Sequence, residues 1–541
     1  MRHLRFTDDK ESIGVLFDRA AEKMPDAVVR LDTPSTLVPR HGTTLTYAAM
    51  ADFVREASGW FSAAGVRPGD RVAVAKTNHF DTLLLGAAAV RLGALPALLS
   101  GGIFPDQAPV MLDRLRPSAV FADRGVIDRW RLLDGSPEYR VVSLDGAHPG
   151  AVPLDDLRGE LPPRPNPPAQ GEPMILTHTS GTTGVPKMVQ HSAASISHRA
   201  KLQTMPWPVV SFRRRDRYAA QLSWSHARAI DGMAAVLHIG CPLLAMATTD
   251  PEVASRALLE FRPTIMEALP NALLYWEPMI QANPEVFTDT RFFISAFDAI
   301  HPRTARICLD ASDKKLAFVL QAYGQSESGG ITGDLYTRRT VRRKPGKAPN
   351  LRSMGFKFLG MSDIRTVDIE TGEPLPRGSF GEFEVKSKGL AMTYYGQEDL
   401  HARRRRNGWW TMGDVGVVTK TGRAILYDRE IDLVPGVESC LELEDRLLDE
   451  LPQLTEVVIV AVDGKAQPVV ATAGEPLDRA AWAKATADLP QLEAPIQLPW
   501  EDIPRTATMK VRRRALVAQL EAQRAAAPAD ADPAPAELTS A

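Results

Sequence analysis

A cluster of hydroxyl groups and glycines after the apolar run Met174–Leu176 has the residue types that bind phosphate. Glycine lacks a Cβ atom, so the backbone at Gly181 and Gly184 can approach a bulky anion. Free backbone N–H groups, hydroxyls and the ammonium group of Lys187 supply the donors and the positive charge that a phosphate requires. This stretch therefore predicts a phosphate-binding loop. Its positions are Thr179, Ser180, Gly181, Thr182, Thr183, Gly184 and Lys187.

The spacing of this loop differs from the Walker A motif. Walker A requires four residues between its glycines and a Ser or Thr after the lysine. Here Gly181 and Gly184 are closer together, and Met188 follows Lys187. Composition alone also fits an ordinary surface loop. The whole string Thr-Ser-Gly-Thr-Thr-Gly-Val-Pro-Lys, residues 179–187, resembles the signature loop of the adenylate-forming superfamily. That superfamily includes acyl- and aryl-CoA ligases, peptide-synthetase adenylation domains and luciferases.

A second motif of that superfamily follows the apolar strand predicted at 318–320. Tyr323-Gly324-Gln325-Ser326-Glu327 is similar to Tyr-Gly-x-Thr-Glu, with Ser326 keeping the hydroxyl group. By itself this string would indicate a turn after a strand. The resemblance implies that Tyr323 packs against adenine, that Gly324 and Ser326 belong to the nucleotide site, and that Glu327 binds Mg²⁺. A carboxylate is an oxygen ligand of the kind that Mg²⁺ prefers.

A third motif surrounds Asp414. The stretch 408–416 is similar to Gly-Trp-x-x-Thr-Gly-Asp-x-Gly, with Met412 in place of the Thr. The resemblance implies that Asp414 accepts hydrogen bonds from both ribose hydroxyls, a role that suits a carboxylate. It also implies that Arg429 reaches the ribose, although Asp428 replaces the usual glycine before it. Read alone, Asp414 would be a turn residue.

A fourth motif lies near the C-terminus. Residues 504–513 resemble Pro-Arg-Thr-x-x-Gly-Lys-x-x-Arg, with Met509 in place of the glycine before Lys510. A lone lysine here would be a surface charge. The resemblance, which covers roughly residues 10–520, implies that Lys510 bridges the carboxylate and the α-phosphate in the adenylation transition state. Lys510, Glu327 and Thr182 are therefore the predicted catalytic residues.

The substrate pocket is less sharply indicated. Trp224 and His226 fall where the superfamily has residues that line the acyl pocket, and Gly329 follows the second motif. Together they favour a small or aromatic carboxylic acid as the substrate. A core or surface histidine remains the alternative for His226. Asp298 could meet a substrate amine, and a loop-capping aspartate is the alternative for it.

The resemblance implies a reaction in which a carboxylate attacks the α-phosphate of MgATP, releases pyrophosphate and leaves an acyl-AMP. Such a reaction depends on positioning and charge neutralisation. Superfamily members then rotate the small domain and pass the acyl group to a thiol of coenzyme A or a carrier protein. Here Ile431 occupies the usual hinge position, followed by Asp432, and the glycine-rich segment that lines the thiol tunnel is shortened to 434–440.

Three hypotheses follow. The first is an ATP- and Mg²⁺-dependent acyl- or aryl-CoA (or carrier-protein) ligase, with coenzyme A as cosubstrate. The second is an adenylating enzyme whose acceptor is not a thiol, through amide formation, β-lactone closure or diazotisation with nitrite. The third is a nucleotide-binding pseudoenzyme that acts as a regulator. The presence of Lys510, Glu327 and Asp414 argues against the third. The oligomeric state is left open.

Bulk composition indicates a soluble globular protein. The chain has 541 residues, of which 44% are hydrophobic and 24% charged, so we expect two or more domains. A formal net charge of −2 gives no electrostatic reason to expect nucleic-acid or membrane binding. The three cysteines lie far apart, without metal-like spacing. The apolar stretch Thr82–Leu99 is interrupted by Arg91 and Pro96, so we predict no membrane span and a cytoplasmic location.

Alternating helices and strands predict the fold class. A helix that begins after Ser12, another from about Thr46, and the turns between apolar runs indicate βαβ units with parallel sheet. The segment 363–385 has the alternation of antiparallel strands. In the C-terminal part we expect helices at 441–451, after Leu477 and from Val511, with a strand at 457–462. The ranges expected in the first part are strands 71–75, 95–99 and 118–122 and helix 81–92.

The predicted architecture is therefore α/β, with two domains. A large N-terminal adenylation domain, residues 1–428, contains parallel βαβ sheets and a small β subdomain. A small mobile α+β lid domain follows at 429–522. The segment 523–541 is rich in Ala and Pro and nearly devoid of large apolar residues, so we expect a disordered tail.

Overall fold

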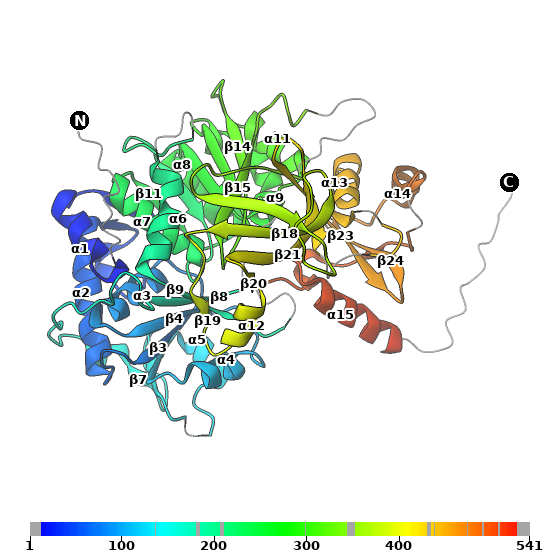
Figure 1. The fold of residues 1–541 in the computed structure, drawn as a ribbon. Coiled ribbons are helices and arrows are strands. Elements are labelled where there is room, and N and C mark those ends of the chain that lie inside the picture. The colour runs from blue at the N-terminus through cyan, green and yellow to red at the C-terminus, as the bar shows by residue number, and fades with distance from the viewer. Residues whose placement is uncertain are drawn as a thin grey trace.

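The computed structural model describes residues 12–135, 137–179, 184–205, 210–297, 299–342, 352–429, 434–437, 439–472, 474–489, 492–506 and 509–526. Two large β-sheets with helices between them form most of the molecule, and a smaller unit built from the C-terminal segment lies at one side (Figure 1). Predictions for Ser180–Thr183, Asp298, Ile431 and Asp432 lie outside the described residues. Within the described part of the chain, none of the helices combines the length and apolar character needed to span a bilayer.

The first sheet has 14 strands and changes from parallel to antiparallel pairing at β14. The antiparallel pair predicted at 363–385 is confirmed as β17 and β18, and it is hydrogen-bonded into this sheet through β21, β22, β16 and β15. In sheet order the strands are β17 (Ser362–Val367), β18 (Phe380–Ser387), β21 (Trp409–Val418), β22 (Arg423–Arg429), β16 (Ser353–Lys357), β15 (Gly329–Tyr336), β14 (Phe318–Gln325), β13 (Phe292–Ser295), β12 (Ile265–Ala268), β10 (Tyr218–Gln221), β11 (Leu243–Met246), β1 (Val28–Leu31) and β2 (Thr44–Thr46), with β20 (Arg405–Arg406) beside β21.

The second sheet has eight strands and is parallel from β8 to β7. The strands predicted at 71–75, 95–99 and 118–122 are confirmed within it. In sheet order the strands are β19 (Thr393–Tyr394), β9 (Met188–His191), β8 (Ile175–His178), β4 (Leu95–Ser100), β3 (Arg71–Lys76), β5 (Ala119–Ala122), β6 (Arg140–Ser143) and β7 (Val152–Pro153).

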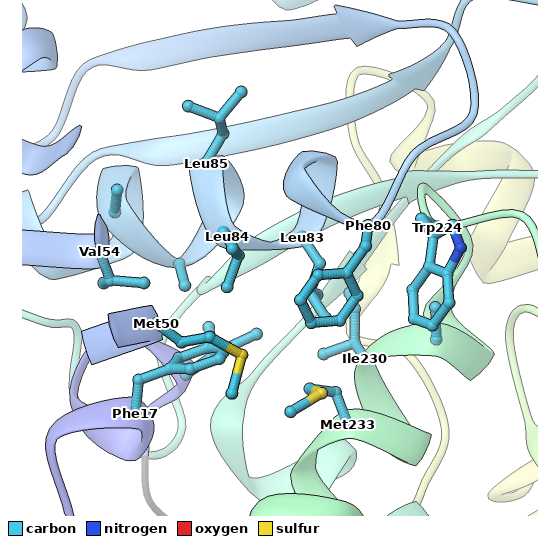
Figure 2. Close-up of a cluster of buried hydrophobic side chains, with 14 of the residues drawn as sticks. Phe17, Met50, Val54, Phe80, Leu83, Leu84, Leu85, Trp224, Ile230 and Met233 are labelled. Carbon is cyan, nitrogen blue, oxygen red and sulfur yellow. The ribbon is translucent and has the colours of Figure 1, made fainter. Parts of the chain in front are cut away.

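Five helices fill the space between the two sheets. Ser12 caps α1 as predicted, because its hydroxyl accepts from the N–H of Gly14. The second helix begins where it was expected, and the hydroxyl of Thr46 caps it by accepting from the N–H of Ala49. The apolar faces of these helices meet in one core with residues from both sheets, and Figure 2 shows part of it. The five helices are α1 (Ile13–Lys23), α2 (Tyr47–Ala63), α3 (Asp81–Leu92), α6 (Ala193–Thr204) and α7 (Ala227–Ile239).

Other helices cover the outer faces of the sheets. One apolar cluster joins α8, α10 and α11 to the first sheet, and another joins α4 and α5 to the second. These covered faces explain why the parallel strands read as continuous apolar runs in the sequence. The helices are α4 (Ala108–Leu115), α5 (Arg124–Trp130), α8 (Pro251–Phe261), α9 (Pro270–Tyr275), α10 (Glu277–Ala282), α11 (Pro302–Asp310) and α12 (Glu398–Arg403).

The C-terminal unit is a three-stranded sheet packed against helices. Its expected helices and first strand are confirmed, whereas β24 was missed because Pro468 interrupts the strand pattern. Helix α15 continues past the tail boundary expected at 523, and the boundary proposed at 428/429 falls at the end of β22. The elements are α13 (Cys440–Glu450), β23 (Leu454–Val462), β24 (Lys465–Thr472), α14 (Arg479–Thr486), β25 (Ile496–Gln497) and α15 (Arg513–Ala526).

Candidate active site

The predicted phosphate loop connects two antiparallel strands, β8 and β9. The N–H of Thr179 donates to the carbonyl of Lys187 (3.0 Å), and the N–H of Lys187 donates to Thr179 Oγ1 (3.0 Å). These two bonds close the base of the loop, and the described chain resumes on its far side at Gly184. The sheet therefore fixes where the loop begins and ends.

Tyr394 connects Glu327 to this loop, because it contacts both Glu327 and Lys187. The hydroxyl of Tyr394 donates to Glu327 Oε1, and the ammonium group of Lys187 lies 5.2 Å from the centre of the Tyr394 ring. The side chain of Glu327 is buried. Among the described residues no cluster of three or more His, Cys, Asp or Glu side chains could hold a metal alone. One carboxylate beside a phosphate loop suits Mg²⁺, which proteins usually bind through one or two carboxylates together with substrate phosphates.

The second and third motifs meet across the antiparallel half of the first sheet. The hydroxyl of Tyr323, at the end of β14, donates to Asp414 Oδ2 on β21 (2.6 Å). Gln325 Nε2 holds the same region of β21 by donating to the carbonyl of Met412 (2.6 Å). Asp414 is also the register partner of Arg429 on β22, whose side chain lies outside the described residues. Residues far apart in the sequence are thus brought to one place.

Lys510 reaches the same region from the C-terminal unit. Its ammonium group donates to the carbonyl of Phe297 (3.4 Å), and Asn271 Nδ2 on α9 donates to the carbonyl of Met509 (2.7 Å). Met509 has a φ of +63°, a left-handed conformation that glycine adopts more easily than other residues. Met509 therefore adopts a conformation that would suit the glycine expected at this position from the resemblance.

The C-terminal unit is held in this orientation by contacts between α11 and α13. His301 Nδ1 lies 2.5 Å from Asp445 Oδ1, and Arg306 pairs with Asp449. Arg303 donates to the carbonyls of Leu448 and Leu454 at 2.9 Å each. Burial alone would lower the pKa of His301, but the hydrogen bond and charge of Asp445, with further carboxylates nearby, raise it to about 9. The imidazolium is therefore favoured at neutral pH.

A cavity lies beside these motifs and is bounded by α6, α7 and strands β13 to β15. His226 caps α7: its Nδ1 accepts from the N–H of Arg228, so Nε2 carries the proton and donates to Ser326 Oγ (2.8 Å). Burial, with the charges of nearby cations, lowers the pKa of His226 to about 3, which keeps the ring neutral. The apolar and aromatic side chains of the lining are Leu202, Val210, Phe212, Ala227, Phe292, Ile294, Ala296, Phe297, Leu320, Ala322, Tyr323, Leu335 and Phe358.

The cavity also contains charged groups that the sequence analysis did not identify. Arg228 Nε and Nη2 donate to the two carboxylate oxygens of Glu267 on β12 (2.8 and 2.6 Å). Glu267 has 0% exposure and also accepts from the hydroxyl of Tyr218 (2.5 Å). Asp231, one turn after Arg228 on α7, lines the cavity as well. Burial raises the pKa of Asp231 to about 6, and the charges of Arg199 and Arg228 oppose a further rise.

One sequence signal could have found this set. Arg228 and Asp231 stand three positions apart on a helix, Ala227–Ile239, that is otherwise almost wholly apolar. Charged residues on a buried helix face require partners, so this spacing indicates a polar site. Arg199, on α6, carried no such signal because its neighbours are polar.

The structure corrects the assignment of Trp224 to the substrate pocket. Trp224 packs edge-to-face against Phe80 in the core and donates its N–H to the carbonyl of Met246 (3.0 Å) (Figure 2). It is absent from the lining of the cavity among the described residues. Gly329 does line it, and a Cβ atom there would meet Arg199 Cγ at 2.8 Å. His226 is likewise absent from that lining among the described residues, but its Nε2 is hydrogen-bonded to Ser326 Oγ, and Ser326 does line the cavity.

Comparisons with known proteins identify the family of this chain. The family model "AMP-binding enzyme" matches residues 17–395. A 3-amino-2-hydroxy-4-methoxybenzoate diazotase of Streptomyces cremeus is 35% identical over 95% of this chain and 96% of its own length. A 3-aminoavenalumate diazotase of a Streptomyces species is 23% identical over 77% and 74%.

Solved structures share the fold. The crystal structure of ATP-bound MatB from Rhodopseudomonas palustris superposes with a TM-score of 0.76 at 20% identity, covering 94% of this chain and 99% of that one. The two-domain α/β architecture predicted from the sequence is therefore confirmed. The matched profile and the near-full-length relative establish that the chain belongs to the AMP-binding family of adenylate-forming enzymes, and it is an ATP-dependent, AMP-forming adenylating enzyme.

Proposed function

We propose that this enzyme is a diazotase, which adenylates nitrite and transfers the nitrosyl group to the amino group of an aromatic acid. The observation that carries this proposal is the 35% identity, over nearly the whole of both chains, to a protein named as the diazotase of an aminobenzoate. It favours the non-thiol alternative from the sequence over transfer to coenzyme A.

In the first step a nitrite oxygen attacks the α-phosphorus of ATP, pyrophosphate leaves, and a nitrosyl adenylate remains. Lys510, which lies beside Phe297, would neutralise charge that develops on the α-phosphate. Thr179, Lys187 and the intervening loop, including Thr182, would hold the phosphates, and Asp414 with Arg429 would hold the ribose. Glu327 would bind Mg²⁺, which supplies charge neutralisation on the phosphates.

In the second step the amine nitrogen attacks the nitrosyl nitrogen and AMP leaves. A cavity wall with the buried Arg228–Glu267 pair and Asp231 supports a polar aromatic substrate, because such groups impose a desolvation cost on a purely apolar acyl chain. Phe297 and Tyr323 offer flat apolar surface for an aromatic ring. The amine and the adenylate can then react at a single site.

This scheme requires no rotation of the C-terminal unit between the two steps. The contacts of α13 with His301, Arg303 and Arg306 stabilise the orientation that places Lys510 in the site. A thioester-forming relative must leave that orientation, and Ile431 is a β-branched residue at the position that would have to absorb the change. These features support a non-thiol acceptor.

The test measures AMP and diazonium formation by the purified protein. The enzyme is incubated with MgATP, nitrite and a set of aminobenzoates, and the diazonium product is trapped as an azo dye. We expect AMP release to depend on nitrite, and dye formation to depend on nitrite and the amine, with no effect of added coenzyme A. Nitrite-independent AMP release that requires both a carboxylic acid and coenzyme A would instead identify a CoA ligase.

A further inference from the structure

The carboxylate of Asp231 is the one charged group of the cavity wall whose hydrogen-bonding capacity is unused among the described residues. No donor in the described part of the chain reaches Asp231 Oδ1, which is itself shielded from solvent. The residue is 5% exposed and lines the cavity. A buried, unsatisfied carboxylate oxygen is costly, so such a group requires an explanation in terms of a ligand or a reaction.

The two neighbouring arginines are satisfied by other acceptors. Arg199 donates to the carbonyls of Gly389 (2.7 Å), Ser326 (3.1 Å) and Glu327 (2.9 Å). Arg228 is bound in a bidentate pair to Glu267. Neither guanidinium forms a described ion pair with Asp231, although the charges of both favour its ionised form.

Gln203 accepts further hydrogen bonds from Arg228. When the Gln203 amide is oriented to satisfy its hydrogen bonds, its oxygen accepts from Arg228 Nη1 and Nη2 at 2.5 and 2.6 Å. Around the cavity wall, Arg199 and Arg228 carry two positive charges and Glu267 carries one negative charge. The sum of these charges is zero only when Asp231 is ionised as well. Asp231 lines the cavity, so a ligand bound there that donates a proton and tolerates negative charge can meet its carboxylate.

We propose that Asp231 accepts a hydrogen bond from the amino group of the aromatic substrate and removes its proton during nitrosation. This inference rests on the proposed function and assigns one step of it to a residue. An aromatic amine has an N–H donor attached to a flat apolar ring, which matches an isolated carboxylate in a wall built from side chains such as Phe292 and Phe297.

The chemistry requires a proton acceptor at this point. The amine nitrogen forms a bond to the nitrosyl nitrogen while the bond from that nitrogen to the AMP oxygen breaks, leaving a positively charged nitrosamine. Asp231 takes one proton from the nitrogen of this nitrosamine, which becomes neutral. The nitrosamine tautomerises to a diazohydroxide, whose hydroxyl leaves as water with the proton returned by Asp231, giving the diazonium ion. Amine and nitrosyl adenylate are thus converted to diazonium, AMP and one water, without an oxidant.

Electrostatics around Asp231 suit this exchange. The groups that face it are Arg199 from α6, Arg228 from its own helix and Glu267 from β12. Its pKa, raised by burial to about 6, leaves the group mostly ionised at pH 7 yet able to hold a proton. A general base works best when its pKa lies near the operating pH.

The experiment compares Asp231→Asn with the wild type in two assays. Nitrite-dependent pyrophosphate release in the absence of amine reports adenylation, and azo-dye formation with an aminobenzoate reports nitrosation. We expect Asp231→Asn to keep pyrophosphate release and to lose dye formation by about 10²-fold or more. Dye formation equal to wild type, or parallel loss of both activities in a folded variant, would overturn the role. Absence of dye with the wild type would instead overturn the proposed function.

A matched control and a second measurement keep the test independent of folding. Asp32 is partly buried and also has an Oδ1 that no described donor reaches, but its other oxygen accepts from the N–H groups of Ala247 and Thr248. Asp32→Asn should leave dye formation unchanged relative to pyrophosphate release. In the wild type, the rate of dye formation should decrease as the pH is lowered through about 6. The rate of adenylation measured without amine should not decrease in that range. Identical pH profiles for both activities would contradict the role of Asp231.

Discussion

The contact between His301 and Asp445 predicts that adenylation depends on pH through the position of the C-terminal unit. His301 begins α11 and Asp445 lies on α13, so their hydrogen bond joins the two parts of the molecule. Lys510 reaches the carbonyl of Phe297 only while these parts are docked. Replacing His301 with Gln should therefore weaken the orientation in which ATP reacts.

The magnitude follows from the pKa of His301. That pKa rises from its ordinary 6.5 to about 9 when the unit is docked. At about 1.4 kcal/mol per tenfold change in proton affinity, this difference corresponds to roughly 3.4 kcal/mol, or about 300-fold in the ratio of docked to undocked molecules. Because the docked pKa is the higher one, the stabilisation is complete below pH 6.5 and is lost as the pH rises through about 9.

The assay measures pyrophosphate release with MgATP and nitrite between pH 6 and 9.5. The ratio of wild-type to His301→Gln rates should be largest at low pH, with about 300-fold as its upper limit, and should approach one above pH 9. His148→Gln is the matched control, because His148 also has a raised pKa through its hydrogen bond with Asp128 but lies far from α13 in sequence and structure. A ratio that stays constant across this range, or an unaffected rate at pH 6.5, would refute the reasoning.

Three further substitutions test the remaining assignments. Lys510→Ala should lower the rate of pyrophosphate release by about 10²–10³-fold while nucleotide binding, measured by titration, is retained; unchanged turnover would remove Lys510 from the mechanism. Asp414→Ala should raise the KM for ATP by roughly 10–100-fold, because the ribose and the hydroxyl of Tyr323 both lose a charged acceptor; an unchanged KM would contradict the ribose role. Trp224→Phe should cost about 1 kcal/mol of stability in thermal or denaturant unfolding through loss of the bond to Met246, and a changed amine preference would contradict its place in the core.

The charged cavity wall connects this chain's architecture to its proposed chemistry. A bidentate pair such as Arg228–Glu267, with Glu267 fully buried, is strongly destabilised by removal of one partner. The two hydrogen bonds of the pair fix the position of the Arg228 side chain beside Asp231. In the proposed reaction, such a fixed wall would hold a small aromatic substrate against the adenylate and limit the access of water that would hydrolyse it.

Several parts of the fold could be predicted because their causes are local. The hydroxyls of Ser12 and Thr46 mark helix starts through hydrogen bonds to residues two or three positions away. Alternation along 363–385 predicts an antiparallel pair for the same reason. The order of the four motifs, from the loop at 179–187 to Lys510, indicates an adenylating enzyme without knowledge of the fold, since the match depends only on residue types and spacing.

The tertiary structure decided what those residues touch. Trp224 and Arg228 stand four positions apart, yet Trp224, which precedes α7, packs against Phe80 in the core, whereas Arg228 on α7 lines the cavity. Asp231 is a buried carboxylate whose pKa is raised by desolvation, and its charged neighbours Arg199 and Glu267 come from a helix and a strand distant in the sequence. Desolvation and charge pairing depend on three-dimensional distance, so the sequence by itself determined the reaction with ATP, while packing between α6, α7 and β12 decided the charged wall of the cavity.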